Sequence, residues 1–394
     1  MDDNFKIVLV ISVLKDGGAE HVMIMLANYF KKKGIPVEMV VTNQKSRDSI
    51  IKGLESNIPI YYLEDNINVV RQKNIMQKVI SAICRFFNFC GFKVPNIMAK
   101  ISFEQYYGNH LNEMKKVLYN HNNWTVLAFL QPANQIVMKA ADGLSNRIYL
   151  SERADPFRYF QTRYAKYFLN YYYPKLAGMI FQTPNAEQAY KKIIQCNGVV
   201  IPNPVSSVLP LPWNGSREKT IVNFCRLAKQ KNLPMLLDAF EIFYKNHRDY
   251  KLIIYGDGEL REELLHNAEM RSCSNNIQFI AHQKDIHNVI LKAGMFVSSS
   301  DFEGMSNSML EAMALGLPVV CTDCPIGGAA AVIRNYENGI LVPVNDAVKM
   351  AEEMAYIADN SEFARKIGRN ASQIRITQSE EAICQRWYDF LCEN

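Results

Sequence analysis

The sequence lacks any uninterrupted apolar run of 18 residues, and its seven histidines have no metal-ligand spacing. Without such a run, no segment is predicted to cross a membrane as a helix. Nine cysteines, an odd number, are scattered along the 394 residues, which is typical of a reduced, cytosolic protein rather than a disulfide scaffold. Cys321 and Cys324 form a C-x-x-C without a second pair. We therefore favour buried thiols there over metal or redox chemistry.

The first half of the chain is short of acidic residues. Residues 1–200 carry 25 Lys and Arg against 15 Asp and Glu, whereas residues 201–394 carry 19 against 24. Residues 66–103 contain no acidic residue, and their six cations are interleaved with phenylalanines and isoleucines. Because basic segments with aromatics suit an anionic membrane surface, we predict peripheral membrane contact there.

A second aromatic segment, residues 157–175, carries nine aromatics, four cations and no acid. It could belong to the core or to the same membrane face, and the sequence leaves both open. No nucleic-acid-binding module is recognisable, so no nucleic-acid partner is expected. The opening segment MDDNFKIVLVISVL begins with acidic residues and leads to no cleavage-type sequence, so it is not predicted to be a signal peptide.

Apolar runs of strand length alternate with helical patterns throughout the chain. The first, FKIVLVIS at 5–12, precedes Gly17-Gly18 and a helical pattern that stops at Gly34. Similar runs follow at 37–42, 58–63, 125–130, 146–152, 177–183, 219–225, 250–256, 277–281, 295–300, 317–322 and 339–344. Repetition of strand and helix predicts an α/β fold with doubly wound parallel sheets.

The length predicts two domains, since single cores stop growing at about 250–300 residues. At IPNPV (201–205) the composition shifts to a Pro/Ser/Gly-rich stretch and the charge changes sign. We therefore predict a Rossmann-like domain at 1–203 and a second one at 204–377. The last residues, 378–394, read as an amphipathic helix.

The stretch DFEGMSNSMLEAMALGLP (301–318) contains two glutamates eight positions apart. Glu303 and Gly304 fall in a strand-to-helix loop, at the carboxyl end of a parallel strand where α/β sheets bind ligands. Amides of residues 304–307 open the helix and suit phosphate oxygens. Glu311, one turn inside, could accept hydrogen bonds from two adjacent hydroxyls. On spacing alone, a solvated Glu303 and a surface Glu311 fit equally well.

Two cations follow an earlier strand. Arg226 comes directly after the run at 219–225, and Lys231 stands five residues on, just before a helix. Such a pair can neutralise a diphosphate, although an exposed loop is the commoner explanation. The sequence GDGEL (256–260) follows the next strand but is not the dinucleotide-binding G-x-G-x-x-G pattern.

Taken together, R-x4-K, GDGEL and E-x7-E followed by A-x-G-x-P resemble the retaining GT-B glycosyltransferases of family GT4. The resemblance extends over the chain through GGAE (17–20), SERADP (151–156), IPNPV and NGILVPVND (338–346). IGG (326–328) and SERADP look most like bacterial transferases that build polysaccharide units on a lipid carrier. The resemblance implies GT-B architecture: two Rossmann-like domains facing a cleft, with 378–394 packing back on the first.

The resemblance also implies roles for individual residues. Arg226 and Lys231 would bind the nucleotide diphosphate, Glu303 the donor sugar and Glu311 the ribose. The remaining donor-site residues would be Gly18, Gly304, Met305, Ser306, Asn307 and His282. The nucleotide base would lie near Ala281–His282, where the family commonly has a glycine. The acceptor or cleft residues would be Gly17, Glu20, Arg153 and Asp155.

The implied activity is hexosyl or N-acetylhexosaminyl transfer from a nucleotide sugar, with UDP favoured, to a hydroxyl of an undecaprenyl-diphosphate-linked glycan. No Asp-x-Asp stands in a convincing loop, so metal-independent catalysis without a cofactor is expected. We expect a cytoplasmic protein on the inner face of the membrane. A GT-B nucleotide-sugar epimerase or hydrolase, or a non-catalytic partner subunit, remains an alternative.

Overall fold

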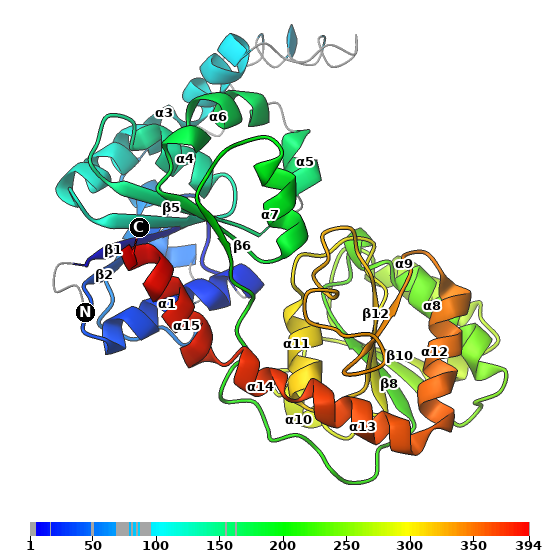
Figure 1. Cartoon of the computed structure of the whole chain (residues 1–394). Coiled ribbons are helices and arrows are strands. Elements are labelled where there is room, and N and C mark those ends of the chain that lie inside the picture. Colours follow the sequence, from blue (N-terminus) through cyan, green and yellow to red (C-terminus); the bar gives the residue numbers. More distant parts are fainter. Residues whose placement is uncertain are drawn as a thin grey trace. The chain divides into compact units, whose positions relative to one another are not determined.

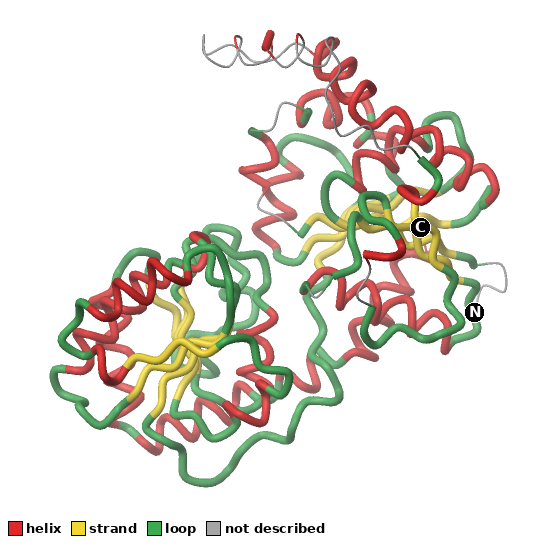
Figure 2. The backbone as a smooth tube through the Cα atoms, turned by 180° about the vertical axis from the view of Figure 1, so that it is seen from behind, coloured by secondary structure: helices red, strands yellow, loops and turns green. Residues whose placement is uncertain are grey.

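The computed structural model describes residues 5–15, 17–48, 51–67, 79, 82–83, 86, 96–153, 156–161 and 164–393. The chain forms two compact units, Met1–Ile201 with Cys384–Asn394, and Pro202–Ile383 (Figure 1). The sequence placed the division after residue 203 and the return at 378. In each unit the strands lie between layers of helix (Figure 2).

The first unit is built on a sheet of seven parallel strands. Their order is β3-β2-β1-β4-β5-β6-β7, with bounds β1 Ile7–Ile11, β2 Val37–Val41, β3 Ile60–Tyr62, β4 Thr125–Phe129, β5 Arg147–Glu152, β6 Gly178–Phe181 and β7 Gly198–Val200. Its helices are α1 Gly18–Lys32, α3 Asn96–Asn120, α4 Ala133–Ala140, α5 Pro156–Phe160, α6 Ala165–Tyr171 and α7 Pro184–Lys191, with short turns η1 Ser46–Asp48, η2 Leu63–Asp65 and η3 Tyr173–Lys175. The central strands are fully buried, as apolar parallel strands covered on both faces require.

The second unit has a sheet of six parallel strands. Their order is β10-β9-β8-β11-β12-β13, with bounds β8 Thr220–Phe224, β9 Lys251–Tyr255, β10 Ile277–Ile280, β11 Met295–Ser298, β12 Val319–Thr322 and β13 Ile340–Val342. Its helices are α8 Leu233–Tyr244, α9 Arg261–Glu269, α10 Ile286–Ile290, α11 Asn307–Ala314, α12 Ala347–Asp359, α13 Ser361–Ala371 and α14 Ile374–Thr377, with turns η4 Lys229–Lys231 and η5 Ser274–Asn276. The predicted doubly wound parallel α/β fold is confirmed in both units.

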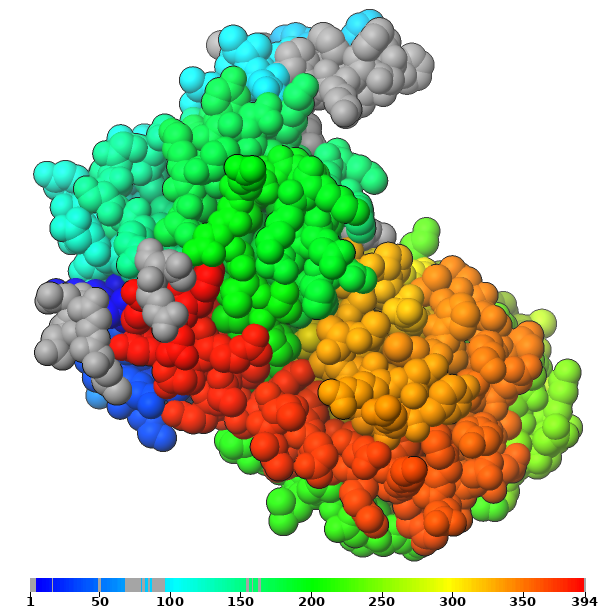
Figure 3. Space-filling model, in the orientation of Figure 1, coloured from blue at the N-terminus to red at the C-terminus, as the bar shows by residue number. Residues whose placement is uncertain are grey.

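The C-terminal helix α15 (Glu380–Glu393) packs on the first unit from Cys384 onward. Trp387 is buried with its ring 5.5 Å from that of Phe129, and Tyr29 donates a 2.7 Å hydrogen bond to Gln385. Figure 3 shows the red residues of this helix covering part of the first unit's surface. The aromatic contacts anchor the chain end because burying a Trp side chain is strongly favourable.

The described part of residues 157–175 belongs mainly to the core of the first unit. Phe157 and Tyr171 are more than half exposed, but the following aromatics are buried: Tyr159, Tyr167, Phe168, Tyr172 and Tyr173. The packing therefore resolves the question that the sequence left open in favour of the core.

The cysteines of the C-x-x-C are free and buried. Cys321 lies on β12 and Cys324 just after it, where its thiol donates to the carbonyl oxygen of Ser300 at 3.1 Å. Burial raises the pKa of Cys324 to about 11. The interpretation as buried thiols is confirmed.

Candidate functional site

The predicted donor-site residues of the second unit gather at the carboxyl edge of its sheet. Strands β8 and β11 are neighbours, so the loops that follow them leave the sheet side by side. The loop after β8 carries Arg226 and Lys231, and the loop after β11 carries Glu303 and Gly304. The topology therefore brings together residues that lie about 70 positions apart in the sequence.

Lys231 and Glu303 form a direct ion pair, which the resemblance did not include. The ammonium of Lys231 contacts Oε2 of Glu303, and the Ser300 hydroxyl donates to the same oxygen at 3.2 Å. The two side chains are 17% and 21% exposed, so the pair is shielded but still reachable from solvent. A ligand with an anion and hydroxyls can therefore exchange contacts with both partners.

Hydrogen bonds lock the two loops together around this pair. Gln230 donates to the carbonyl oxygen of Phe302 at 3.0 Å, and the amide of Asp301 donates back to the carbonyl oxygen of Gln230 at 3.0 Å. The hydroxyl of Ser299 also donates to the carbonyl oxygen of Lys231 at 2.9 Å. These hydrogen bonds hold the backbone under Lys231 and Glu303 in place.

The glycines of the GDGEL turn pack closely against the backbone on both sides of Arg226. A methyl group on Gly256 would overlap the carbonyl oxygen of Cys225, and one on Gly258 would overlap that of Leu227. Gly256 also has a φ of 141°, which side chains rarely tolerate. The guanidinium of Arg226 is exposed and contacts no carboxylate among the described residues. Arg226 therefore lies exposed on a loop whose backbone packs closely against the GDGEL turn.

Helix α11 begins as the sequence predicted. Ser306 is its N-cap and accepts a hydrogen bond from the amide of Met309 at 3.4 Å. Asn203 donates to the carbonyl oxygen of Met305 at 3.1 Å and to Oδ1 of Asn307 at 2.7 Å. The buried Asn203, which sequence reasoning treated only as part of a linker motif, thus fixes the loop between Glu303 and the helix.

The IGG motif also supports this loop. A Cβ atom on Gly328 would collide with the carbonyl oxygen of Gly304, so the two backbones approach each other closely. Only a residue without a side chain fits at position 328. The glycine of the motif therefore has a packing reason at the candidate site.

Glu311 pairs with a histidine that the sequence did not single out. His287 Nε2, on α10, lies 3.0 Å from Oε2 of Glu311, on α11. His282, placed near the nucleotide base by resemblance, is exposed, and its backbone amide donates to Asp257 at 3.0 Å. No sequence spacing connects His287 with Glu311, because the two helices meet only in the folded unit.

In the first unit, the predicted donor residue Gly18 and the predicted acceptor residues lie at two places on the sheet's carboxyl edge. Gly17 is the N-cap of α1, Gly18 is its first residue, and Glu20 lies in its first turn. Arg153 follows β5, with its guanidinium 4.9 Å from the ring centre of Phe129. Burial lowers the pKa of Arg153 to about 9, and the carboxylate of Glu20 opposes that shift. Asp155 lies outside the described residues.

Next to Arg153, the structure reveals a buried carboxyl group that the sequence did not single out. Oε1 of Glu152 accepts hydrogen bonds from Gln131 at 3.1 Å, Asn134 at 3.0 Å and the Tyr173 hydroxyl at 2.9 Å. Burial raises the pKa of Glu152 to about 7, although these hydrogen bonds act in the opposite direction. Glu152 is the last residue of β5, directly before the predicted acceptor residue Arg153.

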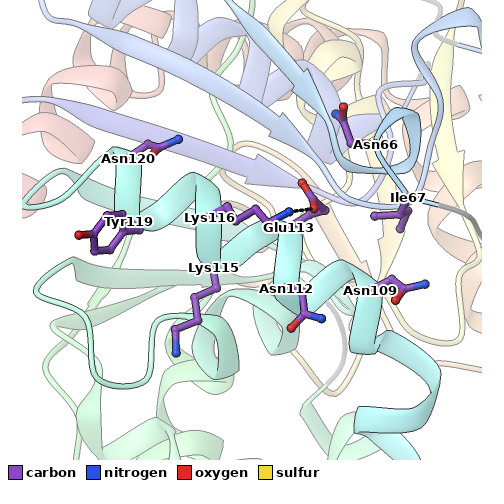
Figure 4. A pocket seen from close by; sticks show the side chains of 9 residues that line it. All are labelled: Asn66, Ile67, Asn109, Asn112, Glu113, Lys115, Lys116, Tyr119 and Asn120. Atoms are coloured by element: carbon purple, nitrogen blue, oxygen red, sulfur yellow. Dashed lines mark hydrogen bonds and ion pairs between the residues drawn. The ribbon is translucent and has the colours of Figure 1, made fainter.

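A cavity of about 910 Å³ on the first unit lies between the end of η2 and one face of α3 (Figure 4). The residues that line it are Asn66, Ile67, Asn109, Asn112, Glu113, Lys115, Lys116, Tyr119 and Asn120. The side chains point in different directions and include none of the predicted site residues (Figure 4). We therefore do not assign it to the candidate site.

Within the described residues, no three His, Cys, Asp or Glu side chains cluster in a way that could hold a metal ion. No helix in the described part of the chain is both long and apolar enough to span a bilayer.

Comparison with known proteins finds similarity to sugar transferases. Residues 214–374 match the family model of glycosyl transferases group 1. Over 98% of both chains, the protein is 21% identical to the GalNAc-alpha-(1->4)-GalNAc-alpha-(1->3)-diNAcBac-PP-undecaprenol alpha-1,4-N-acetyl-D-galactosaminyltransferase of Campylobacter jejuni. A poly(ribitol-phosphate) alpha-N-acetylglucosaminyltransferase of Staphylococcus aureus is 25% identical over 45% of this chain and 36% of its own length.

Solved structures agree on the fold. TarM has a TM-score of 0.77 at 15% identity, covering 100% of both chains. Anabaena HepE in complex with UDP has a TM-score of 0.76 at 15% identity, covering 99% of this chain and 100% of its own. The chain has the GT-B fold of these structures, and the match of residues 214–374 to glycosyl transferases group 1, together with the named relatives, supports a transferase enzyme.

Proposed function

We propose that the protein is a retaining GT4-type transferase that moves a hexose or N-acetylhexosamine from a UDP-sugar to a lipid-linked glycan. The transfer would belong to bacterial polysaccharide synthesis, such as capsule, O-antigen or exopolysaccharide. The observation that carries the proposal is the Lys231–Glu303 pair, which places a cation and a carboxylate at the carboxyl edge of the sheet.

The donor site follows from the positions of these groups. Arg226 and Lys231 would bind the diphosphate, and the amides of Gly304, Met305 and Ser306 at the start of α11 would face sugar and phosphate. Glu303 would accept hydrogen bonds from sugar hydroxyls, because its carboxylate is partly exposed and can only accept when ionised. UDP as the carrier is supported by the HepE complex with UDP-glucose, a fold neighbour.

The proposed chemistry needs no carboxylate nucleophile. The bond between sugar C1 and the diphosphate oxygen breaks, and its electron pair stays on that oxygen. The acceptor hydroxyl attacks C1 from the same face, and its proton passes to the departing phosphate oxygen. The cations stabilise the leaving diphosphate, which makes electrostatic stabilisation the main catalytic effect.

No metal ion is required in this proposal. The cationic side chains and the amides at the start of α11 would neutralise the diphosphate charge that Mg²⁺ neutralises elsewhere. The Lys231 ammonium, now paired with Glu303, would then be shared with the diphosphate.

The acceptor is proposed from relatives and from the first unit. The Campylobacter jejuni relative is an N-acetyl-D-galactosaminyltransferase for a PP-undecaprenol-linked glycan. Gly17, Glu20 and Arg153 would line the acceptor side, and Asp155 remains a sequence prediction. An undecaprenyl-diphosphate-linked glycan is therefore the acceptor that we propose.

Membrane contact through residues 66–103 remains part of the proposal. Most of this segment lies outside the described residues. Its described side chains include five exposed apolar ones, Val79, Ile83, Phe86, Ile97 and Ile101. Exposed apolar groups beside cations suit the inner face of an anionic membrane. Co-sedimentation with phosphatidylglycerol vesicles, lost when the segment's cations are replaced by Gln, tests this contact.

The transfer is tested with membranes that contain lipid-linked glycans and a panel of labelled nucleotide sugars. Label entering the lipid fraction with the donor's anomeric configuration supports the proposal, and inverted product contradicts retention. Epimerised nucleotide sugar without transfer favours the epimerase alternative. Arg226→Ala should lower turnover by about 10²–10³, the effect of removing one charge-stabilising donor. Full activity of that variant would contradict the site.

A further inference from the structure

The contact between His287 and Glu311 joins two helices of the second unit that are otherwise separated in the sequence. His287 Nε2 lies 3.0 Å from Oε2 of Glu311, and the two side chains are 27% and 28% exposed. Ion pairs at this exposure contribute little to stability, because water competes for both partners. The contact between His287 and Glu311 is therefore better explained as a means of orienting the two side chains than as a contribution to folding stability.

The histidine ring is itself held in a defined position. Its ring lies edge-on against Phe224, with 6.5 Å between ring centres and an angle of 89°. Phe224 ends β8 and packs edge-on against Phe296 of β11, at 5.3 Å. Since both aromatic rings belong to the sheet, His287 is anchored to a rigid element. Glu311 is the more flexible partner, with three rotatable bonds.

The geometry leaves part of the carboxylate available. His287 occupies one lone pair of Oε2, and a carboxylate has about four such positions. No described residue contacts Oε1 of Glu311 within hydrogen-bond distance. The carboxylate can therefore accept two further hydrogen bonds from neighbouring hydroxyls while His287 fixes its plane.

We propose that His287 positions Glu311 to accept both ribose hydroxyls of the donor nucleotide, and that the pair thereby selects ribonucleotides over deoxyribonucleotides. This inference rests on the proposed function, in which Glu311 holds the ribose. His287 is a positioning residue: it acts on the nucleotide through the carboxylate and takes no part in the bond changes.

The test measures the affinity of the full-length protein for UDP and for 2′,3′-dideoxy-UDP by titration calorimetry. His287→Phe keeps a ring against Phe224 but removes the N–H donor, and His287→Gln restores a donor near the position of Nε2. We expect His287→Phe to weaken UDP binding about tenfold, as the loss of one hydrogen bond to a charged group would. Dideoxy-UDP should bind wild type and variant equally, and His287→Gln should recover most of the loss.

A double-mutant cycle separates positioning from a general structural effect. In a Glu311→Gln background, His287→Phe should cause no further loss of UDP affinity. His266→Phe, an exposed histidine on α9, serves as the matched control and should leave both affinities unchanged. Equal weakening of UDP and dideoxy-UDP by His287→Phe would overturn the inference, because the ribose hydroxyls would then be irrelevant.

The failure of the proposed function would look different. If Glu311→Gln weakens UDP binding but His287→Phe does not, the donor site stands and the positioning role is wrong. If Glu311→Gln leaves UDP binding unchanged, Glu311 does not bind the ribose. The positioning role of His287 is then wrong as well.

Discussion

The buried carboxyl group of Glu152 should make the first unit less stable as the pH rises. Glu152 is 3% exposed at the end of β5, and burial raises its pKa from 4.5 to about 7. In the unfolded chain, the group ionises near its ordinary pKa. The folded unit therefore holds a proton that the unfolded chain loses between about pH 4.5 and 7.

The sign follows from proton linkage. A carboxyl group with a raised folded pKa contributes its full stabilisation below pH 4.5, and this contribution is lost as the pH rises through about 7. Each unit of difference between the folded and unfolded pKa corresponds to about 1.4 kcal/mol. The whole loss of unfolding free energy is therefore about 3 kcal/mol. Between pH 5.5 and 8.5 the first unit should lose about 2 kcal/mol of unfolding free energy, and above that pH the loss should level off.

The assay is urea unfolding followed by tryptophan fluorescence. Of the three tryptophans, Trp124 and Trp387 belong to the first unit, so a Trp213→Phe background reports that unit alone. Glu152→Gln keeps the shape but cannot ionise, so the amount by which its unfolding free energy exceeds that of wild type should grow by about 2 kcal/mol from pH 5.5 to pH 8.5. Asp142→Asn, at an exposed carboxylate of the same unit, is the control.

The reasoning fails if wild type and Glu152→Gln show parallel pH profiles. Parallel profiles would mean that Glu152 binds its proton equally in the folded and unfolded states. A steeper loss for Asp142→Asn than for wild type would instead point to surface charge as the source.

Three further changes test the supports of the donor site. Gly258→Ala should destabilise the second unit by about 2–4 kcal/mol in urea unfolding, because its methyl group overlaps the Leu227 carbonyl; an unchanged midpoint would contradict the close approach. Asn203→Ala removes a buried donor to Met305 and should weaken UDP binding about tenfold in calorimetry, whereas unchanged affinity would show that the loop holds itself. Arg217→Lys should cost about 2 kcal/mol of unfolding free energy, because the partly buried guanidinium donates to four backbone carbonyls; an equally stable variant would show that these bonds are replaceable.

Local patterns in the sequence were sufficient for most of the fold. The strand β1 within FKIVLVIS is apolar at every position because it is covered on both faces. Its burial can therefore be predicted from the sequence. The start of α11 was predictable because Ser306 is a typical N-cap. Strand β7, Gly198–Val200, was missed because it has three residues and merges with the linker sequence.

The missed site residues share a different cause. Glu152 is polar within an apolar strand, and only its partners from α4 and η3 show that it is buried and hydrogen-bonded. His287 and Asn203 meet their partners across 24 and about 100 positions of sequence. One sequence contains no spacing rule for such contacts, because tertiary packing alone brings the groups together.

The separate supports of residues 301–318 lead to one physical interpretation of that stretch. Lys231 holds the carboxylate of Glu303, Asn203 holds the backbone after it, and His287 holds Glu311. The free-energy cost of orienting these charges is met when the protein folds. The side chains therefore need little reorganisation when a charged transition state forms. If electrostatic preorganisation is the catalytic principle, substitutions at Asn203 and His287 should lower turnover even though these two residues touch no substrate. The two glutamates then act through the rigidity of their surroundings as much as through their own charge.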